Sequence, residues 1–433
     1  MKYHQLHQEL FVDNRNRFKA EMDKGSLAIF QSNDEMPRNG DCFYQFRQDS
    51  DLFWLSGIDQ EQTVLMLFPD HPMESMREIL FLRKTNEHIA IWEGHKYTKE
   101  EAITSSGIKS IYWLEEMPAI YKQLMNKCTK LYANTNENDR AITEVQTRND
   151  RFIQSVRNDY PAHKIQRAAP ILSQLRAIKN KHEIEVIQEA CNITEKAIRR
   201  VMDFVKPGVM EYEIEAEVIS TFIRNRANGH AYSPIIASGK NACCLHYVDN
   251  NDECKDGDLL LMDFGAEYGN YASDLTRTIP VSGKFTDRQK DVYNSVLSVM
   301  RAATEMLVPG NNLTDYHKKV GDLMTIELIK LGLISQEDVN NQDPSWPAYK
   351  KYFMHGTSHF LGLDVHDVGD RYGELKPGMV FTVEPGIYIP EENMGIRIEN
   401  DILITENEPF DLMKNIPIEV EEIEEIMAQK EFV

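Results

Sequence analysis

The spacing of apolar residues in the first third of the chain predicts alternating helices and strands. Four apolar residues at helical spacing predict an N-terminal helix, and the apolar run 27–30 predicts a strand directly after it. Further strands are predicted at 63–68, 78–82 and 110–113, with helices at 99–106 and 117–126. This alternation is typical of a mixed α/β domain.

The pattern changes near residue 170, where long amphipathic helices begin. The segment 173–205 carries apolar residues at helical spacing with charges between them, and predicts one helix of unusual length that ends at Lys206-Pro207-Gly208. Later helices are predicted at 211–227, 287–307 and 313–331. We therefore expect an N-terminal domain over residues 1–170 and a second domain over residues 171–433.

The two helix pairs are each interrupted by a Pro-Gly stop, in FVKPGVM and LVPGNNL. Two copies of a helix-stop-helix unit indicate an internal duplication, which would place a site between equivalent halves. Two similar stops also arise by chance, so both interpretations stay open.

Composition and charge describe an ordinary globular protein with an acidic surface. Of the residues, 42% are hydrophobic and 27% are charged, which is typical of a globular protein. A chain of 433 residues is long enough for two domains that each bury a core of their own. The balance of 48 Lys+Arg against 69 Asp+Glu gives a net charge of -21, which argues against a nucleic-acid or anionic-membrane partner. The six cysteines form no CxxC pair, and the N-terminus lacks the apolar segment of a signal peptide or membrane span. These features predict free thiols and a cytoplasmic location.

The stretch LLLMDFGAEYGNYASDLTR carries the first candidate chemistry. An apolar run ends in Asp263, and Asp274 follows eleven positions later at the end of a second extended run. A buried carboxylate needs a partner or a metal, so two aspartates on neighbouring hairpin strands are expected to face one point. For this pair alone, a solvent-facing hairpin is the alternative.

Three histidines lie close together in MHGTSHFLGLDVHD. His355, His359 and His366 are spaced four and seven apart around two glycines, so they do not share one helix face. We expect a strand or loop that lines a cleft.

Two strands beyond the histidines carry further carboxylates. The apolar strand of LKPGMVFTVEPG ends in Glu384. The strand MGIRIENDILIT alternates, so that Arg397, Glu399 and Asp401 share one face. Arg397 is expected to orient Glu399.

Together these segments supply four carboxylates and one imidazole. No thiolate is among them, which suits divalent ions such as Mn²⁺ and also Co²⁺, Fe²⁺ or Zn²⁺. Five ligands are too many for one tetrahedral zinc and fit two ions that share bridging carboxylates, an arrangement typical of hydrolases. The predicted ligands are Asp263, Asp274, His359, Glu384 and Glu399.

Taken in this order, the motifs resemble the metallopeptidases of the pita-bread fold, and within them the bacterial Xaa-Pro aminopeptidases (aminopeptidase P). The resemblance extends through IIASGKNACCLHY, which contains His246, and PRNGDCFYQFRQDSDLFWLSG, so it covers most of the chain. It implies an α/β (α+β) protein with an N-terminal creatinase-like mixed α/β domain followed by a C-terminal pita-bread domain. Asn400 departs from the pattern, since many members carry Asp there.

The resemblance also implies roles for the metal ligands. Asp263 would bind one metal ion, His359 and Glu384 the other, and Asp274 and Glu399 both. A hydroxide bridging the two ions would attack the bond between any N-terminal residue and a penultimate proline.

Further residues would complete the site. Glu384 would carry the proton of the attacking water to the leaving nitrogen, and His355 would donate to the oxyanion. His246 and His366 would shape the substrate site, and Arg397 and Tyr388 would complete the cleft.

Several functions compete at this point. A prolidase has the same metals and chemistry but is restricted to Xaa-Pro dipeptides. A methionine aminopeptidase generally lacks so large an N-terminal domain, a non-catalytic pita-bread binding protein would not need the intact ligand set, and the histidine disfavours a calcium site. The resemblance favours peptides with proline at the second position as substrates, and a homodimer or homotetramer built through the N-terminal domain.

Overall fold

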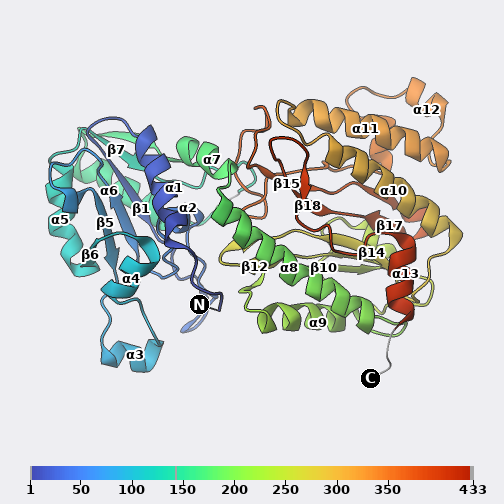
Figure 1. Ribbon diagram of the computed structural model, residues 1–433, viewed down its shortest axis with the longest axis horizontal. Coiled ribbons are helices and arrows are strands. Elements are labelled where there is room, and N and C mark those ends of the chain that lie inside the picture. The colour runs from blue at the N-terminus through green and yellow to red at the C-terminus, as the bar shows by residue number, and fades with distance from the viewer. Residues whose placement is uncertain (1, 142–143, 430–433) are drawn as a thin grey trace. The chain divides into compact units, whose positions relative to one another are not determined.

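The computed structural model describes residues 2–141 and 144–429, which form two compact units. The first spans Gln5–Arg176, and the second begins at Ala177 and also includes Lys2–His4. Helix α7 (Ala169–Ala177) contains the point of division (Figure 1). Each unit has its own strands and helices.

The first unit is built on a six-stranded mixed sheet with the strand order β6-β5-β4-β1-β7-β8. The strand β1 is antiparallel to β4 and parallel to β7, and its six residues are all buried. The sheet strands are β1 (Ser26–Gln31), β4 (Val64–Leu67), β5 (Glu78–Leu82), β6 (Ser110–Trp113), β7 (Lys130–Ala133) and β8 (Lys164–Arg167).

Helices cover this sheet, as the alternating pattern predicted. Each of the strands and helices predicted from apolar spacing in this unit is present, among them α1 (Gln8–Glu21), α4 (Lys99–Ser106) and α5 (Met117–Met125). The prediction of a mixed α/β domain is therefore confirmed. The elements not predicted are α2 (Ser50–Ser56), α3 (Glu87–Glu93), α6 (Arg148–Asp159), β7, β8 and a short hairpin, β2 (Pro37–Asn39) and β3 (Cys42–Phe43).

The helix predicted over 173–205 is two helices, so that prediction was wrong. Helix α7 ends at Ala177, and α8 (Lys181–Phe204) begins after Asn180. The Asn180 side chain accepts hydrogen bonds from the backbone N–H groups of His182 and Glu183, and the Asn180 backbone N–H donates to the Glu183 carboxylate. This capping box starts a new helix where hydrophobic periodicity alone continues.

The remaining helices lie on the two sides of the central strands. Figure 1 shows α8 and α9 (Glu211–Arg224) on one side and α10 (Asp287–Glu305) and α11 (Leu313–Lys330) on the other. Members of each pair pack against each other. The two helix pairs that the Pro-Gly stops delimit thus flank one set of strands.

The strands between these helices fall into small antiparallel sheets. One has the order β10-β11-β14, with β10 (Ile235–Ser238), β11 (Leu259–Asp263) and β14 (Thr276–Pro280). A second has the order β15-β18-β19, with β15 (Val380–Val383), β18 (Asn400–Leu403) and β19 (Phe410–Asp411). A third has the order β13-β12-β9, with β9 (Gly229–His230), β12 (Ala266–Tyr268) and β13 (Tyr271–Ala272).

A two-stranded ribbon joins these sheets. It consists of β16 (Gly386–Ile389) and β17 (Met394–Arg397), and β17 packs against β11 and β14. The single alternating strand predicted from MGIRIENDILIT is therefore two strands, β17 and β18, which belong to different sheets. The side chains of Arg397, Glu399 and Asp401 nevertheless face the same segment, as expected. Arg397 and Glu399 both bond the Thr276 hydroxyl, and Asp401 accepts from the Asp274 backbone N–H.

Candidate metal centre

Asp263 and Asp274, the two aspartates of LLLMDFGAEYGNYASDLTR, face one point, and Tyr232 lies between them. Asp263 is the last residue of β11, and Asp274 lies between β13 and β14. The Tyr232 hydroxyl donates to Asp263 Oδ1 at 2.6 Å and also contacts Asp274 Oδ1. The hairpin is not solvent-facing, since the side chains of the two aspartates are 14% and 7% exposed.

His359 and Glu384 approach the same point from the C-terminal strands. The Nε2 atom of His359 lies 3.5 Å from Asp274 Oδ2 and 3.6 Å from Glu384 Oε1. His359 Nδ1–H donates to the Phe360 carbonyl at 3.0 Å, which leaves Nε2 as the nitrogen that faces the carboxylates. A histidine held in this way is ready to bind a metal ion through Nε2.

Glu399 completes the cluster at the turn between β17 and β18. Thr276 donates its hydroxyl to Glu399 Oε2 at 2.6 Å, and the Glu399 backbone N–H donates to the Thr276 carbonyl at 3.0 Å. Asp274, His359 and Glu399 each offer a ligand atom, and these atoms lie within 4.8 Å of one another. All five residues that the sequence predicts as ligands are thus brought together.

Burial and mutual repulsion raise the pKa values of the clustered carboxyl groups. Burial, followed by the charge of Asp263, holds the pKa of Asp274 well above its usual range. Burial, followed by the charge of Asp274, likewise holds the pKa of Glu399 well above its usual range. Burial raises the pKa of Glu384 to about 7. Such a site is short of positive charge.

The ligand types decide which group would supply that charge. Carboxylate oxygens and an imidazole nitrogen are ligands of hard and borderline divalent ions, and no cysteine lies among these five residues. Bound cations would offset the repulsion between the carboxylates. The residues present therefore fit divalent metal ions.

Arg397 places a cation inside the cluster, and within the described part of the chain no recorded hydrogen bond joins it directly to Glu399, as the sequence predicted it would. Its Nη2 donates to Asp263 Oδ2 at 2.6 Å and its Nε to the Thr276 hydroxyl at 3.1 Å. Glu399 is instead oriented by Thr276, the residue that Arg397 shares with it. Arg397 therefore acts on Glu399 through the Thr276 hydroxyl and not by a direct bond, because Glu399 lies in the turn that follows β17.

His355 stands at the edge of the cluster as a neutral imidazole. Its Nδ1–H donates to the Gly356 carbonyl at 2.8 Å, and Nε2 lies 2.8 Å from the Tyr388 hydroxyl, which accepts from Arg397 Nη1. Burial, followed by the charge of Arg397, lowers the pKa of His355 to about 3. Its distance from Glu384 Oε2 is 3.8 Å.

The other two predicted histidines lie nearby. The His366 ring packs edge-on against the His359 ring, with centroids 4.5 Å apart. His246 is exposed, and its charge is among the causes that lower the pKa of His355.

Sequence analysis missed two residues that hold the ligands. Tyr232 bridges Asp263 and Asp274, and Asp401 accepts the Asp274 backbone N–H through Oδ2 at 3.0 Å. Tyr232 lies in GHAYSP, which has no pattern of its own. Asp401 is fully buried, and its position two residues after Glu399 was the available signal.

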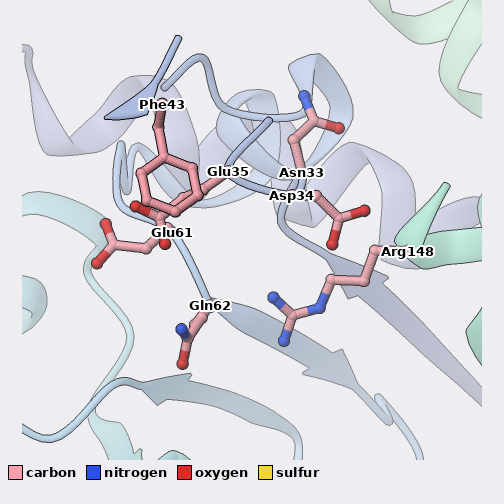
Figure 2. Close-up of a pocket in the computed structure, with 7 residues that line it drawn as sticks. All are labelled: Asn33, Asp34, Glu35, Phe43, Glu61, Gln62 and Arg148. Carbon is pink, nitrogen blue, oxygen red and sulfur yellow. The ribbon is translucent and has the colours of Figure 1, made fainter. Parts of the chain in front are cut away.

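A pocket of about 290 Å³ lies in the first unit, apart from these ligands. Figure 2 shows the residues that line it: Asn33, Asp34, Glu35, Phe43, Glu61, Gln62 and Arg148. Asp34 already pairs with Arg151, and Glu61 with Lys96. None of the candidate ligands lines it.

A family model decides the assignment of the catalytic unit. Residues 185–406, just over half of the chain, match the model of metallopeptidase family M24, and residues 11–132 match that of the aminopeptidase P N-terminal domain. This chain belongs to metallopeptidase family M24. The predicted two-domain fold, with an aminopeptidase P N-terminal domain before a pita-bread domain, is confirmed.

Relatives of this M24 chain match it over nearly its whole length. The Xaa-Pro aminopeptidase of Haemophilus influenzae is 36% identical over 434 residues, covering 98% of both chains. The structure of Pseudomonas aeruginosa aminopeptidase PepP superposes with a TM-score of 0.87 at 32% identity, covering 98% of each chain. Zn-substituted E. coli aminopeptidase P in complex with product has a TM-score of 0.89 at 32% identity, covering 99% of this chain and 100% of that one.

Within residues 2–141 and 144–429, no helix combines the length and the apolar character that crossing a bilayer requires.

Proposed function

We propose that this protein is a metal-dependent Xaa-Pro aminopeptidase, which hydrolyses the bond between an N-terminal residue and a penultimate proline. The observation that carries the proposal is the convergence of four carboxylates, two buried and two partly exposed, with His359 Nε2 in an M24 chain. Relatives named Xaa-Pro aminopeptidase, at 35–36% identity over their full length, support this substrate class.

The proposed metal ligands are the five clustered residues, with Asp274 and Glu399 shared between two ions. Mn²⁺ suits this oxygen-rich set, and Co²⁺, Fe²⁺ or Zn²⁺ could replace it. When bound, the two cations would lower the pKa of a water molecule and polarise the peptide carbonyl. The proposed ligands are Asp263, Asp274, His359, Glu384 and Glu399.

The chain's own residues would move the protons. Glu384 is proposed as the proton acceptor, since a carboxylate that keeps one oxygen beside the attacking water can take its proton. Its Oε2 faces His355 and its Oε1 faces His359. His355 is proposed to stabilise the oxyanion through Nε2–H. As a neutral ring it does so only in the tautomer that carries its single proton on Nε2, which gives up the Nδ1–H bond to the Gly356 carbonyl.

Proline at the second position has a physical reason. The bond to proline has no N–H and a fixed φ, so an enzyme that grips an extended backbone by that hydrogen bond loses it. A rigid apolar wall can contact the ring instead. We propose that His246, His366 and Arg397 take part in shaping this side of the site.

The domain boundaries and the oligomeric state are also proposals. We propose an N-terminal domain over residues 1–170, a catalytic domain over residues 171–433, and a homodimer or homotetramer. A cytoplasmic location stays a prediction.

The test is peptide cleavage followed by mass spectrometry, using metal-stripped protein with and without Mn²⁺. The substrates are the dipeptide Ala-Pro and a longer Arg-Pro-Pro-type peptide. Metal-dependent release of the first residue from the longer peptide is the expected result. Cleavage of the dipeptide alone would assign a prolidase, and no cleavage of either would contradict a peptidase function. The match to the aminopeptidase P N-terminal domain favours the longer substrate.

A further inference from the structure

Glu211 is a fully buried carboxylate that no part of the proposed mechanism uses. It is the first residue of α9, where the helix dipole favours a negative charge. Its Oε1 accepts from the Ser238 backbone at 2.7 Å, the Ser238 hydroxyl at 2.8 Å and Asn241 Nδ2 at 3.1 Å. Its Oε2 accepts from the Tyr247 hydroxyl at 2.7 Å and the Asp252 backbone at 2.9 Å.

All five donors belong to residues 238–252, a segment that begins at Ser238, the last residue of β10. After Ser238, apart from the short 3₁₀ helix Gly239–Cys243, the segment has no regular structure to hold its backbone. Glu211 also donates its own backbone N–H to the Asp252 carbonyl, so it ties both ends of the segment to α9. Asn250 is a second anchor, since its side chain donates to Glu215 and to the Pro234 carbonyl, but the Glu211 side chain is the one that bonds both ends of the segment.

This segment carries His246 and packs against the residues of the metal centre. Ala242 shares a buried cluster with Tyr388, and Leu245, Tyr247 and Met354 pack against that cluster. Tyr388 in turn bonds His355 and Arg397. Leu245 and Tyr247, the two neighbours of His246 in sequence, therefore pack against the same cluster as Tyr388, which bonds His355.

We propose that Glu211 is a positioning residue, which fixes the 238–252 segment so that His246 faces the substrate beside His355. The inference rests on the proposed function and deepens it. Glu211 touches none of the five proposed ligands among its recorded contacts, so it acts on the substrate side of the site and not on the metal ions.

Glu211→Gln is the informative change because it preserves size but not acceptor capacity. A carboxylate accepts at both oxygens, whereas an amide presents an NH₂ group at one of them. In either orientation that NH₂ group faces at least one backbone N–H, from Ser238 or Asp252. Glu213→Gln is the matched control, since Glu213 is exposed, lies two residues away and bonds only the Met210 backbone among its recorded contacts.

The expected result is a loss of kcat/KM on the order of tenfold for Glu211→Gln, mostly in KM, with unchanged Mn²⁺ affinity by calorimetry. The double variant Glu211→Gln/His246→Ala should be no slower than His246→Ala alone, because the effect passes through His246. Equal kcat/KM for Glu211→Gln and Glu213→Gln, or an additive loss in the double variant, would overturn the inference. If Glu211→Gln does not fold, Tyr247→Phe removes a single donor and should show the same dependence on His246.

A readout without substrate separates this inference from the proposed function. The Cys243 thiol is half-buried, contacts the Met394 carbonyl at 3.5 Å, and has its pKa raised by burial. Peptide-resolved alkylation by iodoacetamide should modify Cys243 several-fold faster in Glu211→Gln than in Glu213→Gln. An unchanged rate would contradict the anchoring role even where cleavage occurs, whereas absent cleavage in the unmodified protein with faster alkylation would contradict only the proposed function.

Discussion

Thr276 and Glu399 exchange two hydrogen bonds across the centre of the catalytic unit. The Thr276 hydroxyl donates to Glu399 Oε2 at 2.6 Å, and the Glu399 backbone N–H donates to the Thr276 carbonyl at 3.0 Å. The pair joins the strand that follows Asp274 to the turn between β17 and β18. It therefore links the two halves of the ligand set.

Thr276→Val should weaken metal binding. The change preserves shape but leaves Glu399 Oε2 and Arg397 Nε without their shared partner. We expect a loss of Mn²⁺ affinity of about 10- to 100-fold, measured by calorimetry on metal-stripped protein. Thr278→Val is the control, because Thr278 is also buried on β14 but its recorded bonds are only to the Arg397 backbone. An equal loss in both variants would contradict a specific role for Thr276.

Glu384→Ala should abolish hydrolysis and leave the fold intact. The side chain is proposed both to bind a metal ion and to accept the proton, and its backbone N–H still bonds the Thr357 carbonyl in the variant. We expect at least a 10²-fold loss of kcat on the longer peptide, with an unchanged circular dichroism spectrum. Glu406→Ala, in an exposed loop, should keep full activity. Near-normal turnover by Glu384→Ala would remove Glu384 from the mechanism.

His230 should make the protein less stable as the pH falls. Neither ring nitrogen has a hydrogen-bond partner among the residues that the structure describes, and burial lowers the pKa of His230 to about 4 from 6.5. Because the unfolded state takes up the proton first, the contribution is complete above about pH 6.5 and is lost as the pH falls to about 4, by up to about 3 kcal/mol.

The measurement for His230 is urea denaturation between pH 4 and 7. His230→Phe keeps an aromatic ring against Phe222, whose centroid lies 5.1 Å away, and should show a shallower pH dependence of the free energy of unfolding. His88→Phe, at an exposed position, should retain the original pH dependence. Identical profiles for His230→Phe and the unmodified protein would contradict this assignment.

Removing one partner of the buried ion pair between Lys179 and Asp367 should destabilise the fold, whereas replacing both partners by apolar residues should have a much smaller effect on the free energy of unfolding. Lys179 Nζ lies 3.1 Å from Asp367 Oδ2, and both side chains are 1% exposed. Lys179→Met leaves a buried charge without its ion-pair partner and should lower the free energy of unfolding by about 3 to 5 kcal/mol. Lys179→Met/Asp367→Leu should recover most of that loss in urea denaturation. A double variant as unstable as the single one would show that packing, and not charge, is what the pair supplies.

Local chemistry along the chain was enough to predict four of the six sheet strands and three helices of the first unit, and the residues of the candidate metal centre. Apolar spacing placed helices and strands because burial of one face is a local property of the repeat. Asp263 and Glu384 were recognisable because each ends an apolar run, and a carboxylate in that place needs a cation. The family resemblance rests on the same short motifs.

Tertiary structure alone decided what each of these residues touches. Arg397 bonds Asp263 directly and acts on Glu399, its neighbour in sequence, through Thr276, because Glu399 lies in the turn that follows β17. Tyr232 joins two aspartates that lie 31 and 42 residues away, and Glu211 holds a segment that begins 27 residues later. Such contacts depend on which strands pair and in what register, which is set by packing over the whole unit, so no local pattern encodes them.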